Sequence, residues 1–327
     1  MDRLARILGN VMGSNSRSFS WGLVLAILLV AALDLTVRAL ETRLSGDIAN
    51  TRSFPERVAE LSAAPGEKVA AIGNSLIGDG LDKPVFLANW LKMNPGAGSA
   101  IKLVPDGSGI WDWHCIVHYE LANASQGPDL VLIGFGWNQL SDQNGLSITR
   151  AFNGLCPATA MWGFSALSGR IGVNDWLEMA AVKTSKLYAH REPIRHRILQ
   201  NVIPDYRRMT WQLNARAGDV GDAEGTQGRR STSYNALSSI LEKLSGRGSR
   251  VVLVAMPVMN PYEIDRGLCN VISDTPHRFL DMRYAVPSTH DLYRDSLHLN
   301  EAGARLFSER LAAELSTPNA PMRPCSI

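Results

Sequence analysis

The chain has 327 residues, of which 45% are hydrophobic and 20% are charged, and its formal net charge is +2. This composition excludes a disordered or fibrous protein and allows one or two domains with a sizeable core. The balanced charge gives no sign of polyanion binding, so nucleic acid is not an expected partner. The four cysteines, at 115, 156, 269 and 325, lack the CxxC spacing of a zinc site or redox motif. A disulfide between Cys156 and Cys269 is one possibility if the domain lies outside the cytoplasm.

The first predicted element is an apolar helix near the N-terminus. Residues 19–33, FSWGLVLAILLVAAL, carry no charge, and the apolar stretch reaches Val37 if Asp34 is tolerated near its end. At about 1.5 Å per residue, this length suits a bilayer span. We expect a single-pass anchor in the inner membrane at 19–37, with residues 1–18 cytoplasmic; a cleaved signal peptide and a buried core helix are the alternatives. The counts of Lys and Arg do not decide the orientation, but the short first flank favours a catalytic part in the periplasm or at the cell exterior.

The body of the chain alternates short apolar runs with helical patterns. Residues 38–66 are expected to form a juxtamembrane helix and linker, and residues 67–315 the main domain. The predicted strands are Lys68–Gly73, Ile101–Pro105, Asp129–Gly134, Arg250–Met256 and Arg278–Tyr284. These runs are apolar almost throughout, which is typical of a parallel sheet covered on both faces. The sequence therefore predicts an open, doubly wound α/β sheet.

Two segments do not fit this alternation. Residues 141–230 form a long insertion, which ends in a Gly-rich stretch, 217–230, expected to be a mobile loop. A helical part of the insertion is basic, with Lys183, Lys186, Arg191, Arg195 and Arg197. A solvated helix face is the simplest interpretation of these charges, and a surface for anionic lipid or an acidic polymer is the alternative. Residues 316–327 contain three prolines and are expected to be a tail.

A serine follows the first predicted strand, in the stretch VAAIGNSLIGDGLD. The carboxyl ends of the strands line the ligand crevice of an open α/β sheet, so Ser75 is expected to lie where a ligand binds. Its hydroxyl can cap the following helix by accepting a backbone N–H. It can also act as a nucleophile if a neighbouring base takes its proton.

A base and a carboxylate stand together more than two hundred residues downstream. Asp295 and His298 are three apart, just before a helix predicted to begin at Asn300. A histidine activates a serine well when a carboxylate fixes its tautomer, and a single turn can supply both groups. A surface pair without function is the alternative.

Candidate oxyanion donors follow the next two predicted strands. Gly107 and Gly109 lie in PDGSGIWDW, where unhindered N–H groups can face a developing oxyanion. Asn138 follows the third strand in IGFGWNQLSD, and its amide can donate to the same oxyanion. Taken singly, glycines make turns and asparagine favours loops.

Aromatic residues at the same strand ends are candidates for substrate binding. Trp111, Trp113 and Trp137 flank the glycines and Asn138, where indoles can stack on sugar rings or line an acyl pocket. Packing in the core is the alternative for each. His114 and His118 are spaced as i and i+4 on a predicted helix, but without a third ligand they are expected to be ordinary helix residues. We expect neither a metal nor a cofactor.

In this order, the blocks GNSL, DGSG, GWN and DSLHLNEAG resemble those of the SGNH/GDSL hydrolase superfamily, over residues 68–315. The resemblance implies a flavodoxin-like three-layer α/β/α fold. It also implies roles for a nucleophile (Ser75), a general base and acid (His298), an orienting carboxylate (Asp295) and an oxyanion hole (Ser75 N–H, Gly109 or Gly107, and Asn138). The chain departs from the family pattern at Asn74, where an Asp is frequent, and in its long insertion.

A single span joined to such a domain is also similar to bacterial envelope acyl-transfer proteins, including those of alginate O-acetylation and teichoic acid D-alanylation. Members of that group act beside a membrane-bound O-acyltransferase and polysaccharide biosynthesis machinery. The resemblance implies transfer of an acyl group, such as acetyl, to an envelope glycan hydroxyl through acyl-Ser75, without a cofactor. A membrane-anchored carbohydrate esterase, deacetylase or lipase-like esterase with the same triad, and a catalytically silent polysaccharide-binding scaffold, are the alternatives.

Overall fold

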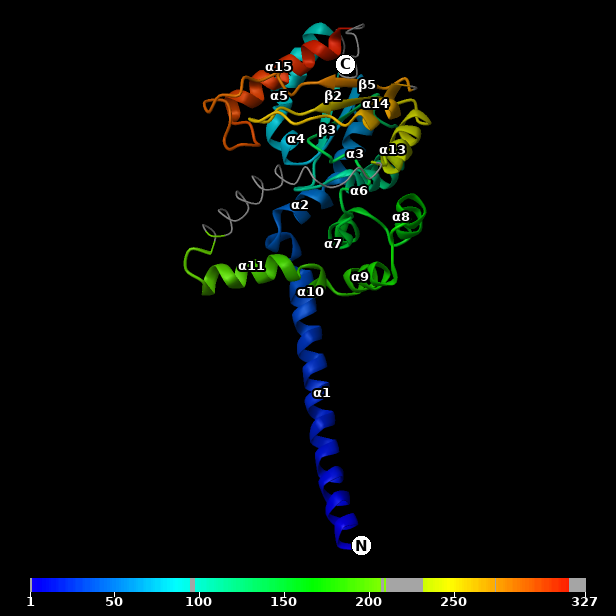
Figure 1. Cartoon of the computed structure of the whole chain (residues 1–327), viewed down its shortest axis with the longest axis vertical. Helices are drawn as coiled ribbons and strands as arrows, with labels where there is room; N and C mark the ends of the chain where they lie inside the picture. The colour runs from blue at the N-terminus through cyan, green and yellow to red at the C-terminus, as the bar shows by residue number, and fades with distance from the viewer. Residues whose placement is uncertain (1, 95–97, 207–208, 210–231, 274, 318–327) are drawn as a thin grey trace.

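The computed structural model (Figure 1) describes the chain apart from residues 1, 95–97, 207–208, 210–231, 274 and 318–327, and for residues 2–20 it describes the backbone alone. The loop expected at 217–230 lies outside the described residues. So does most of the expected tail, whose first residue, Ser316, ends a helix.

Five parallel strands form one sheet in the order β2-β1-β3-β4-β5. They are β1 (Glu67–Ile72), β2 (Gly98–Leu103), β3 (Leu130–Phe135), β4 (Arg250–Ala255) and β5 (Arg278–Asp281). In the register, Ala70 lies beside Ile101 on one side and Val131 on the other. All five predicted strands are confirmed, because near-continuous apolar runs suit strands that are buried on both faces.

Helices cover both faces of the sheet (Figure 1). One layer contains α5 (Lys83–Met93) and α15 (Glu301–Ser316). The other contains α3 (Phe54–Ala63), α6 (Ile110–Cys115) with its π-helical continuation η1 (Ile116–Leu121), and α13 (Asn235–Ser245). The short helix α4 (Ser75–Gly80) follows β1, and α14 (Arg266–Ser273) lies between β4 and β5 in the chain. The expected flavodoxin-like α/β/α fold is confirmed.

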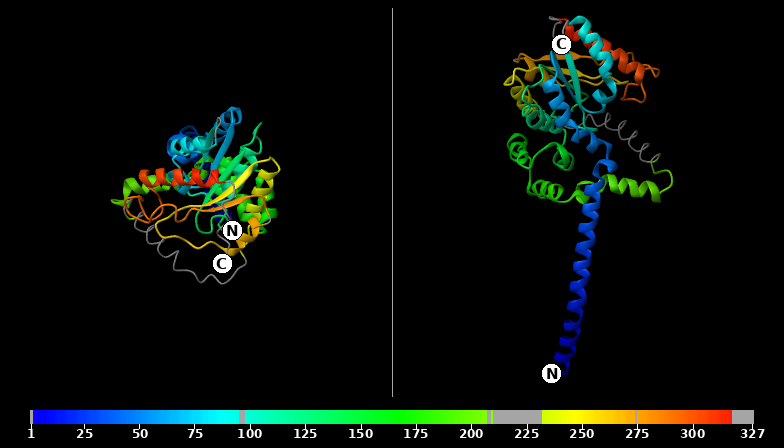
Figure 2. Two further views of the ribbon diagram at one scale, coloured as in Figure 1. Left: turned by 90° about the horizontal axis from the view of Figure 1, so that it is seen from above. Right: turned by 180° about the vertical axis from the view of Figure 1, so that it is seen from behind.

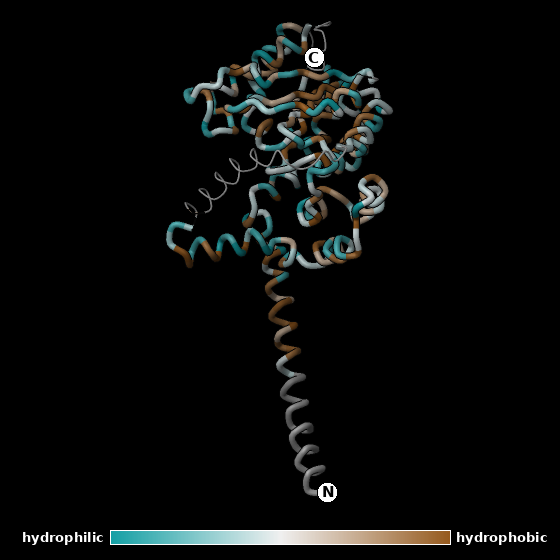
Figure 3. The backbone as a smooth tube through the Cα atoms, viewed as in Figure 1, coloured by the Kyte–Doolittle hydropathy of each residue, from teal (hydrophilic) through white to brown (hydrophobic). Residues whose placement is uncertain are grey.

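A long helix, α1 (Asp2–Leu44), projects from this domain, as the two orientations in Figures 1 and 2 show. Its part from Trp21 to Leu44 is long and apolar enough to cross a membrane. Large apolar side chains such as Leu25 and Leu28 are about 60% exposed there, and the backbone is brown in Figure 3. The helix is therefore not a core helix of the domain.

The segment expected to form a juxtamembrane helix and linker, 38–66, is largely helical and is packed against the domain. It continues α1 to Leu44 and then forms α2 (Gly46–Arg52) and α3. On α3, Phe54, Val58 and Leu61 are buried in the core. The expected helix is present, but α3 is not a linker, because these residues recur at helical spacing and give it an apolar face for the sheet.

The insertion is helical over its described part. It forms α7 (Ile148–Arg150), the π-helical η2 (Ala151–Leu155), α8 (Ala160–Ser168), α9 (Val173–Thr184), α10 (Lys186–Ala189) and α11 (Arg191–Val202). Phe152 and Phe164 are almost fully buried and join this part to the main core.

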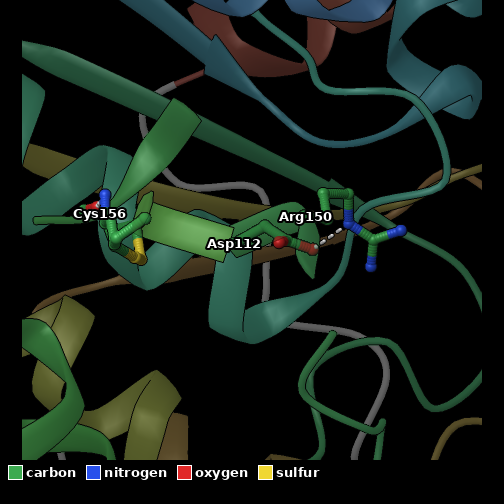
Figure 4. Close-up of a disulfide and its surroundings, with 5 residues drawn as sticks. Asp112, Arg150 and Cys156 are labelled. Atoms are coloured by element: carbon green, nitrogen blue, oxygen red, sulfur yellow. Dashed lines mark hydrogen bonds and ion pairs between the residues drawn. A yellow bond between two sulfur atoms is a disulfide. The ribbon is translucent and has the colours of Figure 1, made fainter. Parts of the chain in front are cut away.

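A disulfide also connects the insertion to the main domain. It links Cys115, at the end of α6, with Cys156, directly after η2, and the two Cα atoms are 5.3 Å apart (Figure 4). The pairing of Cys156 with Cys269, considered as one possibility, is wrong, because the fold brings η2 against α6. A Cα separation in this range is what disulfide geometry requires.

Candidate active site

Ser75 is the first residue of α4 and follows β1 after a two-residue turn. Asn74 occupies the N-cap position, where its Oδ1 accepts the Leu76 N–H at 3.0 Å. The interpretation of Ser75 as the cap is therefore wrong, and its hydroxyl is available for another partner. The turn runs so close to β3 that a Cβ on Gly73 would lie 2.8 Å from the carbonyl oxygen of Gly134.

The Ser75 hydroxyl lies beside His298. Its Oγ is 2.9 Å from His298 Nε2. On the other side of the ring, His298 Nδ1 is 2.9 Å from both carboxylate oxygens of Asp295. A carboxylate accepts the N–H at Nδ1, which leaves the lone pair of Nε2 facing the hydroxyl. This arrangement can remove the serine proton during nucleophilic attack.

Backbone N–H groups hold the carboxylate of Asp295 in its charged form. Its Oδ1 accepts the N–H of Leu297 at 2.9 Å and that of His298 at 2.8 Å. Burial raises the pKa of Asp295, but the hydrogen bonds from Leu297 and His298 outweigh it and keep this pKa below its ordinary value. The Asp295 side chain is 40% exposed and that of His298 is 19% exposed, so water reaches the outer side of the pair.

The loop that carries both groups is fixed by its own backbone. The Arg294 N–H donates to the His298 carbonyl at 2.8 Å and closes the turn. The Met259 N–H, from the loop after β4, donates to the Ser296 carbonyl at 3.1 Å. The position of the Asp295 carboxylate therefore depends on the end of β4 as well as on its own turn.

Helix α15 packs directly beneath this loop. Asn300 caps the helix as predicted, with its Oδ1 accepting the Gly303 N–H at 3.1 Å and its Nδ2 donating to the Asp291 carbonyl at 2.7 Å. A Cβ on Gly303 would lie 2.2 Å from the carbonyl oxygen of Leu292. Glycine is thus required where the helix meets the loop.

The loop after β2 packs against the turn that presents Ser75. Ser108 Oγ is 3.0 Å from the Gly73 carbonyl, and Asn74 Nδ2 donates to the Ser108 carbonyl at 3.4 Å. Trp113 Nε1 lies within 3.2 Å of both the Gly73 carbonyl and Ser108 Oγ. These positioning contacts were missed in the sequence, where the one available signal was a serine between two turn-forming glycines.

The structure separates the two candidate glycines. The Gly109 N–H donates to Asp112 Oδ2 at 3.1 Å, and the same oxygen accepts Arg150 Nε at 3.0 Å (Figure 4). Gly109 is therefore not presented to an oxyanion in this conformation. Gly107 has a φ of +58°, which requires glycine at this turn. Burial raises the pKa of Asp112 despite the opposing effects of Arg150 and the Gly109 N–H.

Two other candidate donors remain available at the same sheet edge. Asn138 lies exposed in the turn after β3. This turn is joined to the loop after β2, because the Ile110 N–H donates to the Gln139 carbonyl at 3.1 Å. Within the described part of the chain, the Ser75 N–H donates to no protein acceptor.

Two of the three candidate tryptophans are wrong as substrate contacts. Trp111 and Trp113 are 3% and 0% exposed, because α6 turns both indoles into the core, where Trp111 packs edge-on against Phe164. Trp137 differs: it is partly exposed, stacks on Tyr262 with ring centroids 5.2 Å apart, and has a φ of +44°. A bulky residue in the left-handed region is strained, and such strain is concentrated at functional sites.

His114 and His118 stack on each other with ring centroids 4.0 Å apart, and both lie near Ser239 Oγ. Burial, and then the neighbouring His118, lower the pKa of His114 to about 3, so its ring is neutral at physiological pH. Among the residues that the structure describes, no group of three or more His, Cys, Asp or Glu side chains is placed to hold a metal ion.

No protein-family model matches the sequence, and no curated protein matches it. Among solved structures, the chain is similar to a catalytic mutant of Axe2, an acetylxylan esterase from Geobacillus stearothermophilus. The identity is 11% and the TM-score 0.38, over 78% of this chain and 96% of that one. A second Axe2 structure has 12% identity and a TM-score of 0.40, over 78% and 97% of the two chains.

Proposed function

We propose that this protein is a membrane-anchored serine acyltransferase that passes an acyl group through Ser75 to a hydroxyl of an envelope polysaccharide. The observation that carries the proposal is the 2.9 Å contact between Ser75 Oγ and His298 Nε2, with Asp295 on the far side of the ring. A serine hydroxyl becomes an effective nucleophile when a base is aligned in this way.

In the first half-reaction, Ser75 Oγ attacks the carbonyl carbon of an acyl donor while His298 Nε2 takes the hydroxyl proton. Asp295 stabilises the imidazolium that forms. The Ser75 N–H and the Asn138 amide supply hydrogen bonds to the oxyanion. The bond to the leaving group then breaks, His298 returns the proton to it, and Ser75 carries the acyl group as an ester.

In the second half-reaction, His298 takes the proton of an acceptor hydroxyl, whose oxygen attacks the acyl-Ser75 carbonyl. The ester to Ser75 breaks, and its oxygen recovers the proton. A sugar hydroxyl held beside Trp137 has a high effective concentration at this step, which water lacks. Sugar binding along this edge therefore favours transfer over hydrolysis.

Two features support a place outside the cytoplasm. The disulfide between Cys115 and Cys156 suits an oxidising compartment. Helix α1 supplies one stretch that can anchor the chain in the inner membrane. The proposed acyl donor is delivered by a membrane-bound O-acyltransferase, which would make that enzyme and the polysaccharide machinery the partners.

Hydrolysis is the second candidate, and the exposure of the site favours it. Asp295 is 40% exposed, so water has access to the triad. An esterase or deacetylase would use the same acyl-Ser75 intermediate and differ only in the nucleophile that His298 deprotonates.

The first experiment tests the shared chemistry with the full-length protein in lipid nanodiscs and a nitrophenyl acetate substrate. Ser75→Ala and His298→Ala should each reduce turnover to background, because the nucleophile and its base act as a unit. Ser238→Ala, an exposed serine on α13, is the matched control and should retain full activity. Wild-type turnover by Ser75→Ala would exclude the acyl-Ser75 intermediate.

The second experiment separates transfer from hydrolysis. The protein is incubated with an acyl donor and envelope oligosaccharides, and the products are analysed by mass spectrometry. Transfer predicts acylated oligosaccharide and faster donor consumption when the acceptor is present. Rapid donor cleavage that ignores every glycan, together with removal of acyl groups from pre-acylated glycans, would support the deacetylase instead.

A further inference from the structure

The insertion places a layer of helices around the point where α1 leaves the domain. This layer, called the basal layer here, consists of α9, α10 and α11, and it is the lowest part of the domain in Figure 1. Helix α11 runs across the direction of α1 in the views of Figures 1 and 2. If α1 crosses a bilayer, α11 therefore runs roughly parallel to the bilayer surface.

Specific contacts fix the basal layer to α1. Asp34 Oδ1 accepts the Ser185 hydroxyl at 2.7 Å and the Leu187 N–H at 2.8 Å. Arg38 donates to the Thr184 carbonyl at 3.1 Å. The depth of the basal layer is thus tied to a defined turn of the spanning helix.

A buried charge cluster continues this junction towards the domain. Glu41 is fully buried, lies 2.8 Å from Lys186 Nζ and 3.0 Å from His190 Nε2, and also pairs with Arg52. Removing one partner from such a cluster is strongly destabilising, so the junction is a rigid connection.

Helix α11 has exposed apolar side chains beside α1, on the same side as Arg191 and Arg195. Ile194, Ile198 and Val202 recur at i, i+4 and i+8, and the latter two are 56% and 71% exposed. With Val30 of α1, residues Ile194 and Ile198 line a groove of about 580 Å³. Val30 lies one turn before Asp34, farther from the domain, so these apolar side chains face the bilayer.

The opposite side of α11 is polar. Glu192 lines a cavity of about 540 Å³ together with Asp47 and Asp106, which belong to the domain above the layer. At 100° per residue, Glu192 is about 160° around the helix from Ile194 and about 120° from Ile198. Helix α11 thus turns Glu192 towards the domain, and Ile194 and Ile198 towards the groove beside α1.

Helices α8 and α9 add a second exposed apolar group on the other side of α1. Val173 and Leu177 of α9 are 76% and 64% exposed, while Met179 and Val182 on its other face are buried. Trp162 of α8 is 71% exposed and stacks obliquely on Trp176, with ring centroids 4.6 Å apart. Tryptophan at such a position is typical of a membrane interface.

The uncharged part of α1 is shorter than the hydrocarbon core of a bilayer, so a bilayer around α1 would reach the exposed apolar side chains of α9 and α11. Between Arg17 and Asp34 the chain offers sixteen uncharged residues, about 24 Å of helix at 1.5 Å per residue. The hydrocarbon core of a bilayer is about 30 Å thick. Leu35, 64% exposed, lies beyond Asp34 and would otherwise face water.

We infer that the basal layer, with Trp162, lies in the interfacial region of a phospholipid bilayer. The apolar side chains of α9 and α11 enter the boundary between head groups and acyl chains, and the exposed Arg195 and Arg197 contact lipid phosphates. This inference rests on the proposed anchoring by α1. It adds that the insertion is a membrane-binding element that fixes the height of Ser75 above the bilayer.

The test measures depth with spin labels on the full-length protein in vesicles of phosphatidylethanolamine and phosphatidylglycerol. Single cysteines replace Ile198 and Leu177 in the basal layer (I198C, L177C) and Leu28 in the span (L28C). Glu192→Cys, on the polar side of α11, is the matched control, and Glu309→Cys, exposed on α15, is the aqueous reference. Accessibility to oxygen and to a water-soluble nickel complex gives the depth of each label.

The labels at 198 and 177 should show oxygen-to-nickel accessibility ratios several-fold above those at 192 and 309, and below that at 28. Ratios at 198 and 177 equal to the aqueous reference would overturn the inference while a lipid-like ratio at 28 still supported the anchor. Protection from both reagents would indicate a protein occupant and would also overturn it. An aqueous ratio at 28 would refute the anchoring itself.

Discussion

The Asp295→Asn substitution tests the hydrogen-bonding logic of the triad. In the structure, Oδ1 of Asp295 accepts the N–H groups of Leu297 and His298, and both carboxylate oxygens lie 2.9 Å from His298 Nδ1. The asparagine oxygen must keep the position that accepts the backbone N–H groups. Its NH₂ group then occupies the place of Oδ2 and donates to Nδ1, so the ring proton moves to Nε2 and points at Ser75. A protonated Nε2 cannot act as the base.

The cost follows from the hydrogen bonds that change. Losing the charge-assisted bond to His298 costs about 1.5–3 kcal/mol, and the neutral bond that now favours the wrong tautomer adds about 0.5–1.5 kcal/mol. Asp295→Asn should therefore lower kcat by about 30- to 2,000-fold. Asp295→Ala loses the first contribution alone, because it leaves no donor beside Nδ1, and should lower kcat by about 10- to 160-fold.

The assay compares nitrophenyl acetate turnover by the two variants, with urea unfolding as the check that both are folded. Asparagine should be the more damaging substitution although it is closer in shape to aspartate. If Asp295→Asn were as active as Asp295→Ala or more active, or remained within about threefold of the wild type, the tautomer argument would be refuted.

Three further predictions concern residues around the site. Burial, and then the neighbouring His118, lower the pKa of His114 from 6.5 to about 3. The neutral His114 ring therefore makes its full contribution to the free energy of unfolding above pH 6.5. As the pH falls from 6.5 to 3, that free energy decreases by up to about 1.4 kcal/mol per pH unit. Denaturant unfolding at several pH values should show a flatter profile for His114→Phe and an unchanged one for the exposed control His290→Phe. Gly303→Ala should cost on the order of 1–3 kcal/mol in unfolding free energy and also reduce esterase activity, because its Cβ would clash with the Leu292 carbonyl; an active variant of wild-type stability would contradict the close packing. Trp137→Ala should leave small-ester hydrolysis intact and abolish its acceleration by oligosaccharide acceptors, and retained acceleration would exclude the stacking role.

The parts of this molecule that could be predicted are those that depend on short stretches of sequence, such as apolar runs and the spacing of neighbouring residues. Continuous apolar runs predicted every strand, because a strand that is buried on both faces is apolar throughout and does not alternate between apolar and polar residues. The order of strands along the chain then placed Ser75 at the sheet edge. Asp295 and His298 needed only their spacing and the helix start at Asn300 to be placed on one turn. The structure brings His298 within hydrogen-bond distance of Ser75, and Asp295 within hydrogen-bond distance of His298.

The errors arose where the outcome depends on contacts between distant segments. Helix α6 is buried along its whole length, Asp112 and His114 included, so it has no solvent face, and Trp111 and Trp113 both turn inward. The partner of Cys156 was set by the packing of η2 against α6. The Gly109 N–H donates to the buried carboxylate of Asp112 and is not free for an oxyanion. Asp112 in turn forms an ion pair with Arg150 of the insertion. The Gly109–Asp112 bond is a local capping contact, but the Arg150 ion pair and the disulfide have no signal in the local sequence.

The junction between α1 and the insertion bears on the choice between transfer and hydrolysis. A flexible tether would be sufficient for an esterase that meets diffusing substrates, and residues 38–66 were expected to form a juxtamembrane helix and linker. Instead, Asp34 and Glu41 bind the insertion through hydrogen bonds and buried ion pairs, and Phe54 locks the following helix into the core. A rigid connection raises the effective concentration of two sites only when its length matches their separation. With the proposed anchoring by α1, this connection would hold Ser75 at one height above the bilayer, which suits the acyl transfer from a membrane-embedded donor that we propose.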